Sequence, residues 1–276
     1  MTVPDFWNNY SLNARHHFFV EEAVSKIISV HSFRGGTGKS NTSANLAYLC
    51  AARGLRVGVV DTDIQSPGIH VLFGLDEEKM EKGKSLNDYL WGKCAIEETA
   101  HDVTSDLDAT LKGRIFLIPS SIKAGEIARV LREGYDVGLL NDGFDALVKN
   151  LNLDLLVIDT HPGLNEETLL SIAISDILVL IMRPDQQDYQ GTSVTVDVAR
   201  KLDVPKMFLM INKVPGKINL DEVKKDVEKI YDCEVAAVIP HSDDLMTLAS
   251  SGIFSCKYPS HEVTKIYQQL VNRILE

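Results

Sequence analysis

The chain has 276 residues, of which 45% are hydrophobic and 24% are charged, a composition typical of a globular protein with a sizeable buried core. Its formal net charge of −11 argues against a general binder of nucleic acid or anionic lipid, because affinity for such polyanions comes largely from clustered Lys and Arg. No stretch approaches the roughly 18 consecutive apolar residues that a membrane-spanning helix needs, so none is expected.

The first 25 residues are predicted to form an N-terminal arm outside a single domain that spans residues 26–276. The arm lacks the basic and apolar regions of a signal peptide. Its aromatic side chains favour packing on the domain's own surface, with a partner or dimer contact as the alternative. These aromatic residues are Phe6, Trp7, Tyr10, Phe18 and Phe19.

Seven short apolar runs, rich in β-branched residues, are predicted strands: 26–32, 55–61, 114–120, 153–159, 176–182, 205–211 and 234–240. Several are apolar throughout, as expected for parallel strands covered on both faces. Helical patterns fill most of the gaps between them. We therefore predict an α/β fold with a doubly wound, mainly parallel sheet and helices on both faces.

Two further segments carry weaker signals. Residues 75–112 are charged and weakly periodic, and we expect a surface insertion over the sheet edge with one short helix near 85–91. Residues 261–276 have apolar side chains on one helical face, which we predict packs on the core. A helix lying on a membrane is the alternative, but it would usually carry more Lys and Arg.

The stretch HSFRGGTGKSN follows the first predicted strand and opens a predicted helix at about residues 38–52. Its glycines, Gly35, Gly36 and Gly38, let the backbone wrap around an anion with amide groups pointing inward. Lys39 would reach the β- and γ-phosphates of a nucleotide, and the Ser40 hydroxyl would bind Mg²⁺. The sequence therefore predicts a phosphate-binding loop, with a mere glycine-rich turn as the alternative.

Carboxylates follow two other strands. Asp61 and Asp63 are two residues apart, so they project from the same side if the strand persists to residue 63. Asp159 ends another apolar strand at the same edge, where it can support Mg²⁺ through water, and the backbone of Gly163 can reach the γ-phosphate. We interpret His161, between them, as a mobile loop residue rather than a general base.

The motifs FRGGTGKSN, DTDIQSPG and DTHPG, in this order and spacing, resemble the MinD/ParA family of deviant Walker-A ATPases from about residue 26 to the C-terminus. FLMINKVP and AAVIPHSDDLMTLASSG resemble the family's adenine-binding segments. The resemblance implies a cytoplasmic P-loop ATPase that uses ATP and Mg²⁺. Implied nucleotide contacts are Gly35, Gly36, Thr37, Gly38, Lys39, Ser40, Asn41, Gly163, Asn212 and Pro240. Implied catalytic residues are Lys39, Asp63 and Arg34, and implied metal-binding residues are Ser40, Asp159 and Asp63.

The chain departs from the family pattern at two positions of the loop. Phe33 replaces the first glycine, and Arg34 stands where the family has a signature lysine that reaches the partner's phosphates across an ATP-bound dimer. Arg keeps the charge and offers a planar fork suited to phosphate oxygens. We therefore predict a working site; a site that binds ATP with little hydrolysis is the alternative.

The resemblance also implies partners: a homodimer formed on ATP and a protein activator or cargo adaptor. Residues 196–230 hold eight basic and six acidic side chains, so nonspecific DNA binding stays open but is not favoured. Membrane attachment is favoured still less, for want of a basic amphipathic tail. A biosynthetic enzyme on the same fold is a further alternative. The cysteines, Cys50, Cys94, Cys233 and Cys256, form no CxxC pair, so a zinc or iron–sulfur site is not expected, and unpaired thiols suit a reducing cytoplasm.

Overall fold

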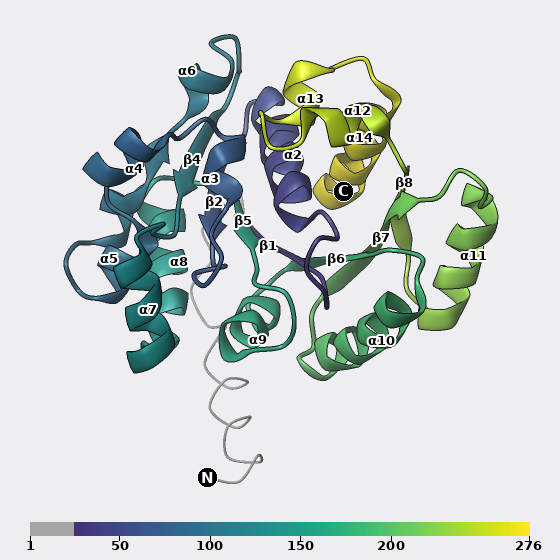
Figure 1. The fold of residues 1–276 in the computed structure, drawn as a ribbon, viewed down its shortest axis with the longest axis horizontal. Helices are drawn as coiled ribbons and strands as arrows, with labels where there is room; N and C mark the ends of the chain where they lie inside the picture. The colour runs from purple at the N-terminus through teal and green to yellow at the C-terminus, as the bar shows by residue number, and fades with distance from the viewer. Residues whose placement is uncertain (1–24) are drawn as a thin grey trace, which may run out of the picture.

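The structure is a computed structural model and describes residues 25–276, so the predicted N-terminal arm lies outside the described residues except for Ser25. One eight-stranded sheet has the order β3-β4-β2-β5-β1-β6-β7-β8 (Figure 1). The strands are β1 (Lys26–His31), β2 (Arg56–Asp61), β3 (His101–Asp102), β4 (Arg114–Ile118), β5 (Leu155–Asp159), β6 (Ile177–Met182), β7 (Lys206–Val214) and β8 (Val235–Pro240). Every pairing is parallel except that of β3 with β4. The predicted doubly wound, mainly parallel sheet is confirmed, and each of the seven predicted runs contains a strand.

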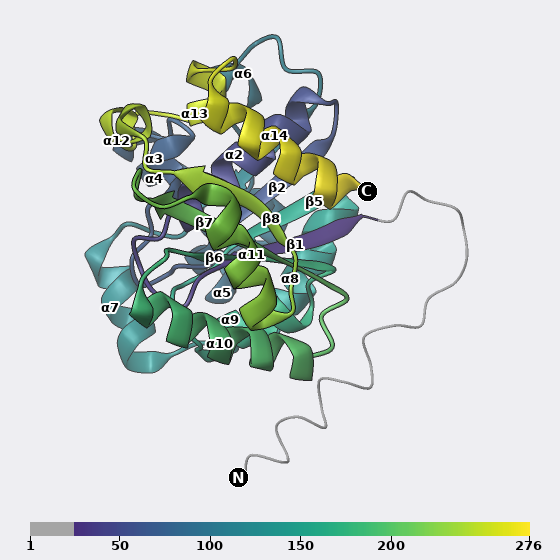
Figure 2. The same ribbon diagram turned by 90° about the vertical axis from the view of Figure 1, so that its right-hand side faces the viewer.

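Helices cover both faces of the sheet. Figure 1 shows α2 and α14 above it and α9 and α10 below it, and Figure 2 shows the same two layers from the side. The helices are α2 (Lys39–Ala52), α3 (Ile69–Leu72), α4 (Glu77–Lys82), α5 (Leu86–Leu90), the 3-10 helix η1 (Ile96–Thr99), α6 (Thr104–Leu107), α7 (Ala124–Glu133), α8 (Gly138–Asn150), α9 (Glu166–Ala173), α10 (Gln186–Lys201), α11 (Leu220–Tyr231), α12 (Asp243–Leu248), α13 (Phe254–Lys257) and α14 (Glu262–Leu275).

The apolar runs are explained by burial on both faces. Every residue of β5 and of β6 is buried. Alternate side chains enter different cores: Val157 packs in the core beneath α2 and α14, whereas Leu156 and Ile158 pack in the core beneath α8. Because successive side chains of a strand point to opposite faces, a strand between two helical layers needs apolar residues at every position.

The C-terminal helix packs on the core as predicted. α14 buries Val263, Tyr267, Leu270, Val271 and Ile274. These side chains belong to the same core as the apolar face of α2. No helix within residues 25–276 is long and apolar enough to cross a membrane.

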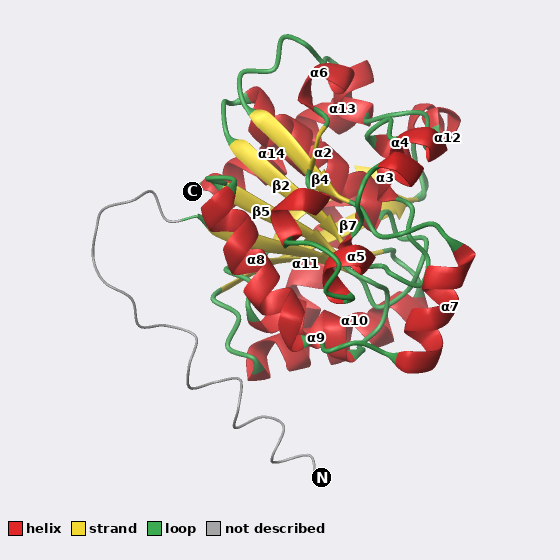
Figure 3. Ribbon diagram, turned by 90° about the vertical axis from the view of Figure 1, so that its left-hand side faces the viewer, coloured by secondary structure: helices red, strands yellow, loops and turns green. Residues whose placement is uncertain are grey.

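The segment 75–112 holds more regular structure than the single helix expected near 85–91. It contains α4, α5, η1, β3 and α6, and Figure 3, which views the molecule from this side, shows the short helices α4, α5 and α6. The start of α4 is capped by the side chain of Asp76, and at the start of α5 the Asp88 carboxylate accepts a hydrogen bond from the Ser85 backbone N–H at 3.0 Å. Helices of four to six residues give too few turns for an apolar period to show in the sequence, which explains the error.

Candidate functional site

Three loops and the end of a fourth parallel strand meet at the carboxyl edge of the sheet and line a cavity of about 540 Å³. The loops follow β1, β2 and β5, the strand end belongs to β7, and α12 and the residues after it form a further wall. Such an edge is where open α/β sheets bind ligands. The residues that line this cavity include Gly36, Gly38, Lys39, Ser40, Asp63, His161, Asn212 and Lys213.

The loop after β1 presents unused backbone amides to this cavity. Gly36 and Gly38 have φ values of 74° and 106°, a left-handed conformation that favours glycine. α2 begins directly after Gly38, and no side chain caps its first turn, which also lacks acidic residues. A helix N-terminus with free N–H groups and no nearby carboxylate of its own is suited to bind an anion.

Two consecutive residues at the end of β7 hold the outer side of this loop. The Asn212 amide donates from Nδ2 to the Thr37 carbonyl at 2.7 Å, and Lys213 Nζ donates to the Gly36 carbonyl at 2.8 Å. Carbonyls fixed outward leave the neighbouring amides facing inward. A Cβ atom on Gly38 would lie 2.5 Å from Asn212 Nδ2, so the loop and β7 fit only with glycine there. Asn212 was predicted to contact the base; the role of Lys213 was missed, although it directly follows Asn212.

Lys39 lines the cavity, whereas Asp159 is buried behind it and is not among the lining residues. Burial lowers the pKa of Lys39, while Asp159, Asp63 and Asp61 oppose this shift. Asp159 accepts a hydrogen bond from Ser43 Oγ at 2.8 Å, and burial raises its pKa to about 6. Sequence reasoning did not find Ser43, which lies one helical turn beyond Lys39.

The expectation that Asp61 and Asp63 share one face of a strand is wrong. β2 ends at Asp61, whose buried carboxylate accepts hydrogen bonds from the backbone N–H groups of Asp63 at 3.0 Å and Gly68 at 3.3 Å. Burial, together with Asp159 and Asp63 nearby, raises the pKa of Asp61 well above its usual range. Asp61 therefore shapes the loop, and Asp63 alone reaches the cavity.

The loop after β5 contacts the loop after β2. His161, which was interpreted as a mobile loop residue, has a side-chain partner: its Nδ1 lies 2.6 Å from Asp63 Oδ1. The backbone N–H of Gly163, predicted to face a γ-phosphate, donates to the Ser32 carbonyl at 3.3 Å in this structure. Pro240, the other predicted backbone contact, ends β8 and is not among the residues that line the cavity.

Arg34 lies at the exposed rim of the site. Its Nη1 is 3.2 Å from a carboxylate oxygen of Asp185 and 3.2 Å from one of Asp188, both at the start of α10. The Asp188 side chain is 3% exposed and the Arg34 side chain 37% exposed. Asp188 is also bound by the Nε of Arg183 at 3.1 Å. The two acidic residues were not predicted, because nothing in the sequence connects α10 with the phosphate loop.

Phe33 is accommodated by a glycine on α10. A Cβ atom on Gly191 would lie 2.1 Å from the Phe33 ring, so the ring rests directly on the backbone of the helix. Phe33 is absent from the residues with positive φ. The missing loop glycine is therefore compensated by a glycine elsewhere.

His31, at the end of β1, is a further buried polar residue that the sequence did not single out. Its Nδ1 lies 2.7 Å from Thr160 Oγ1, which links the loops after β1 and β5. Burial, with Lys39 and His161 nearby, lowers the pKa of His31 to about 3. The imidazole is therefore neutral in the folded protein at ordinary pH.

Three residues in and behind the cavity fit Mg²⁺. Ser40, Asp159 and Asp63 offer only oxygen ligands, and the three carboxylates of this region exceed its one buried cation, Lys39. Among residues 25–276, no cluster of three or more His, Cys, Asp or Glu side chains could hold a metal by itself. Mg²⁺ commonly binds in this way, through one or two protein oxygens, water and substrate phosphates.

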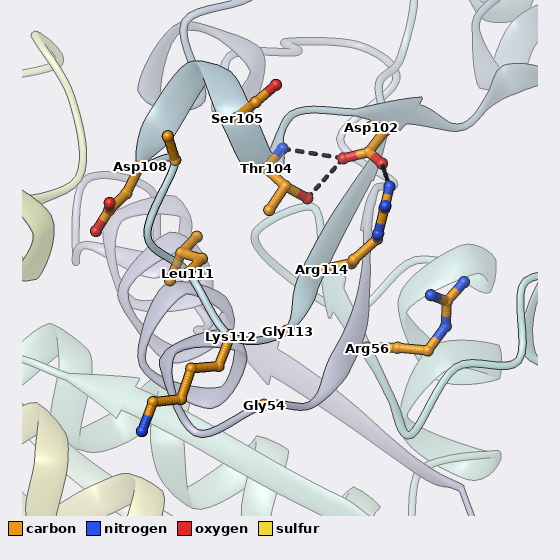
Figure 4. Close-up of a pocket in the computed structure, with 11 residues that line it drawn as sticks. Gly54, Arg56, Asp102, Thr104, Ser105, Asp108, Leu111, Lys112, Gly113 and Arg114 are labelled. Carbon is orange, nitrogen blue, oxygen red and sulfur yellow. Dashed lines mark hydrogen bonds and ion pairs between the residues drawn. The ribbon is translucent and has the colours of Figure 1, made fainter.

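A second hollow, of about 640 Å³, lies at the opposite edge of the sheet, where β2 and β4 begin. Figure 4 shows Arg114 pointing to Asp102, which also accepts hydrogen bonds from Thr104. Arg56 donates to the carbonyls of residues 151 and 152. Because its charged side chains are largely satisfied by the protein, this hollow is a weaker candidate than the cavity at the carboxyl edge.

Comparison with known proteins agrees with this geometry. Residues 25–211 match a family described as AAA domain. An uncharacterised ATP-binding protein of Methanocaldococcus jannaschii is 24% identical over 249 residues, which are 90% of this chain and 87% of that protein.

Two solved structures share the fold. The septum site-determining protein MinD of Pyrococcus horikoshii, complexed with Mg-ADP, superposes with a TM-score of 0.75 at 20% identity, covering 91% of this chain and 96% of that one. A plasmid partition protein of Borrelia burgdorferi, bound to AMPPNP, gives a TM-score of 0.70 at 22% identity, covering 91% and 98%.

Proposed function

The chain belongs to the AAA-domain family, and from this premise we propose that it is an ATP-dependent molecular switch. It binds Mg·ATP, dimerises in that state, hydrolyses the nucleotide slowly by itself and separates after hydrolysis. A protein activator or cargo adaptor accelerates the cycle. The observation that carries this proposal is one cavity that combines free loop amides, the buried Lys39 and the carboxylate of Asp63.

The loop and Lys39 bind the phosphates. The inward amides of residues 35–40 and the ammonium of Lys39 complement negative charge on the β- and γ-phosphates. The carboxylates of Asp159, Asp63 and Asp61 near Lys39 repel the phosphates of a nucleotide until Mg²⁺ binds with them. Mg²⁺, held by Ser40 and through water by Asp159, would neutralise phosphate charge that develops during transfer. The two similar structures described above are named as complexes with Mg-ADP and with AMPPNP, which supports ATP as the substrate here.

Asp63 positions the attacking water, and Arg34 supplies charge across the dimer. Asp63 lies on a loop at the mouth of the cavity with part of its side chain exposed. The Arg34 side chain is 37% exposed and is paired with the exposed Asp185 and the buried Asp188. An arginine supplied in trans contributes ~10³–10⁵ to the rate in other phosphate-transfer systems. We assign this role to Arg34.

The test is the oligomeric state of the Asp63→Ala variant with Mg·ATP and then with Mg·ADP, measured by multi-angle light scattering, with wild-type ATP turnover in parallel. Removing the water-positioning carboxylate traps the ATP state, so we expect a dimer with ATP and a monomer with ADP. Adding Arg34→Ala should abolish the dimer. A monomer in every condition would overturn the sandwich dimer, and an ATP-bound dimer of the wild type without turnover would favour a nucleotide-gated binding module.

A further inference from the structure

Asp63 depends on hydrogen bonds for its orientation because it lies beyond the end of its strand. β2 ends at Asp61, and the Asp63 backbone N–H is held by the Asp61 carboxylate at 3.0 Å. The carboxylate of Asp63 therefore stands on a loop without neighbouring strand partners. A carboxylate rotates through a broad range about its last torsion, so an unheld one would not position water well.

Two groups hold one oxygen of this carboxylate and leave the other open. Oδ1 accepts from the backbone N–H of Ser66 at 3.1 Å and lies 2.6 Å from Nδ1 of His161. Oδ2 accepts no hydrogen bond from any of the residues 25–276. The Asp63 side chain is 18% exposed and lines the cavity, so Oδ2 has access to water.

His161 is itself fixed by its surroundings. Pro162 follows it and restricts its backbone to extended conformations. Its carbonyl accepts a hydrogen bond from Thr168 Oγ1 at 3.3 Å, which ties the loop to α9. A carboxylate oxygen accepts hydrogen bonds, so a proton on Nδ1 makes His161 the donor to Asp63. His161 can therefore hold Asp63 from the loop after the neighbouring strand β5.

We propose that His161 is a positioning residue for hydrolysis: it donates from Nδ1 to Oδ1 of Asp63 and so turns Oδ2 toward the attacking water. This inference rests on the proposed function, since it requires that Asp63 positions water. It replaces the interpretation of His161 as a mobile loop residue. The imidazole acts through Asp63 and is not required to take the proton of the water.

Three variants of the full chain test the role: His161→Asn, His161→Gln and His161→Ala. The Asn amide nitrogen occupies about the place of Nδ1, whereas the Gln nitrogen reaches about one bond further. We expect His161→Ala and His161→Gln to lower kcat by ~100-fold, as a misplaced group can. KM and ATP-dependent dimerisation should change little, because neither depends on this contact. His161→Asn should restore kcat to within about fivefold of the wild type, since it returns the donor.

A double variant separates action through Asp63 from independent action. If His161 works only through that carboxylate, Asp63→Ala combined with His161→Ala should be no slower than Asp63→Ala alone. Thermal unfolding of each variant checks the fold.

Several outcomes would overturn the proposal. A His161→Ala protein as fast as the wild type, or faster, would show that the contact is idle or restrains Asp63. A His161→Gln protein that is active while His161→Asn is not would place the role at Nε2, and additive losses in the double variant would show independent action. A wild type without any ATP turnover would refute the proposed hydrolysis itself. Normal turnover in the wild type and in His161→Ala alike would refute only the role of His161.

Discussion

The two charged sides of the nucleotide cavity are built in opposite ways. On the acidic side, Asp61 and Asp159 end buried strands, are almost fully covered and are bound by backbone or hydroxyl groups. On the basic side, Arg34 lies at the surface and is paired with carboxylates of a helix. Charges buried in the sheet cannot exchange partners cheaply, whereas an exposed ion pair contributes little and can be replaced. The acidic side therefore suits a permanent role, and the basic side suits a contact that changes during a cycle.

Release of Arg34 would not leave a buried charge unpaired. Asp188 is the covered member of the cluster, and Arg183 binds it through both its backbone N–H at 2.9 Å and its Nε at 3.1 Å. An unpaired buried carboxylate would lower the free energy of unfolding by ~3–5 kcal/mol. Because Arg183 remains in place, Arg34 can leave for the phosphate of a partner without that penalty.

The largest effect is expected on the buried side. Lys39→Met should weaken ATP binding by ~100-fold or more, because it removes a charged contact to phosphate and leaves the surrounding carboxylates uncompensated. Calorimetric titration with Mg·ATP measures it. Lys112→Met is the matched control. Lys112 lies at the hollow on the opposite edge of the sheet, so this variant should bind ATP with the affinity of the wild type. Equal affinity of wild type and Lys39→Met would remove Lys39 from the phosphate site.

The second-largest effect is expected where Phe33, on the exposed side of the site, packs on α10. Gly191→Ala forces a methyl group into the Phe33 ring, and we expect a loss of ~1–3 kcal/mol in the free energy of unfolding, measured with urea. Phe33→Gly in the same chain should recover part of that loss, because it removes the collision. Gly125→Ala on α7 is the control, since an added Cβ there meets nothing within 4 Å. Strict additivity of the two changes would contradict the contact.

The pH dependence of the free energy of unfolding tests the buried side of the site. His31 has a folded pKa of about 3 against an ordinary value of 6.5, so below pH 6.5 the unfolded chain binds a proton that the folded chain refuses. Its contribution to stability is complete above that value and is lost as the pH falls, by ~2 kcal/mol at pH 5.

The same pH dependence should be measured for His31→Asn, which keeps a donor toward Thr160. This variant should lose less stability than the wild type between pH 7 and pH 5. The raised pKa of Asp159 acts in the opposite direction in both proteins, because its folded form binds the proton first, so it cancels in the comparison. Identical pH profiles would mean that His31 titrates normally when folded.

The smallest effect on the monomer is expected for Arg34→Ala. Its pairs are exposed on the arginine side, and Asp188 keeps Arg183, so the free energy of unfolding should fall by less than ~1 kcal/mol. Urea unfolding without nucleotide measures this. Arg34→Lys is the control for charge without the planar fork. A loss of several kcal/mol would make Arg34 a fixed structural residue and would end the contrast between the two sides.

The parts that the sequence revealed are those determined along one strand or loop. Apolar runs predicted the strands, and GGTGKS predicted a loop in which Gly36 and Gly38 do adopt positive φ values. Contacts between loops were not accessible, because they depend on how the strands are ordered. His161 meets Asp63, and Lys213 meets Gly36, only because β5, β2, β1 and β7 end at one edge. The two-residue β3 is too short to show any alternation.

The pairing of β7 has a consequence for insertions and deletions. Toward β6 the register is regular up to Ile211, opposite Met182, whereas toward β8 it shifts twice between Leu209 and Val214. A change of length in β8 can be absorbed where the pairing is already irregular. A residue lost from β7 before Asn212 cannot, because a shift of one position turns each side chain to the other face of the strand. The regular pairing with β6 thus fixes the position of Asn212, so that its amide reaches the phosphate loop.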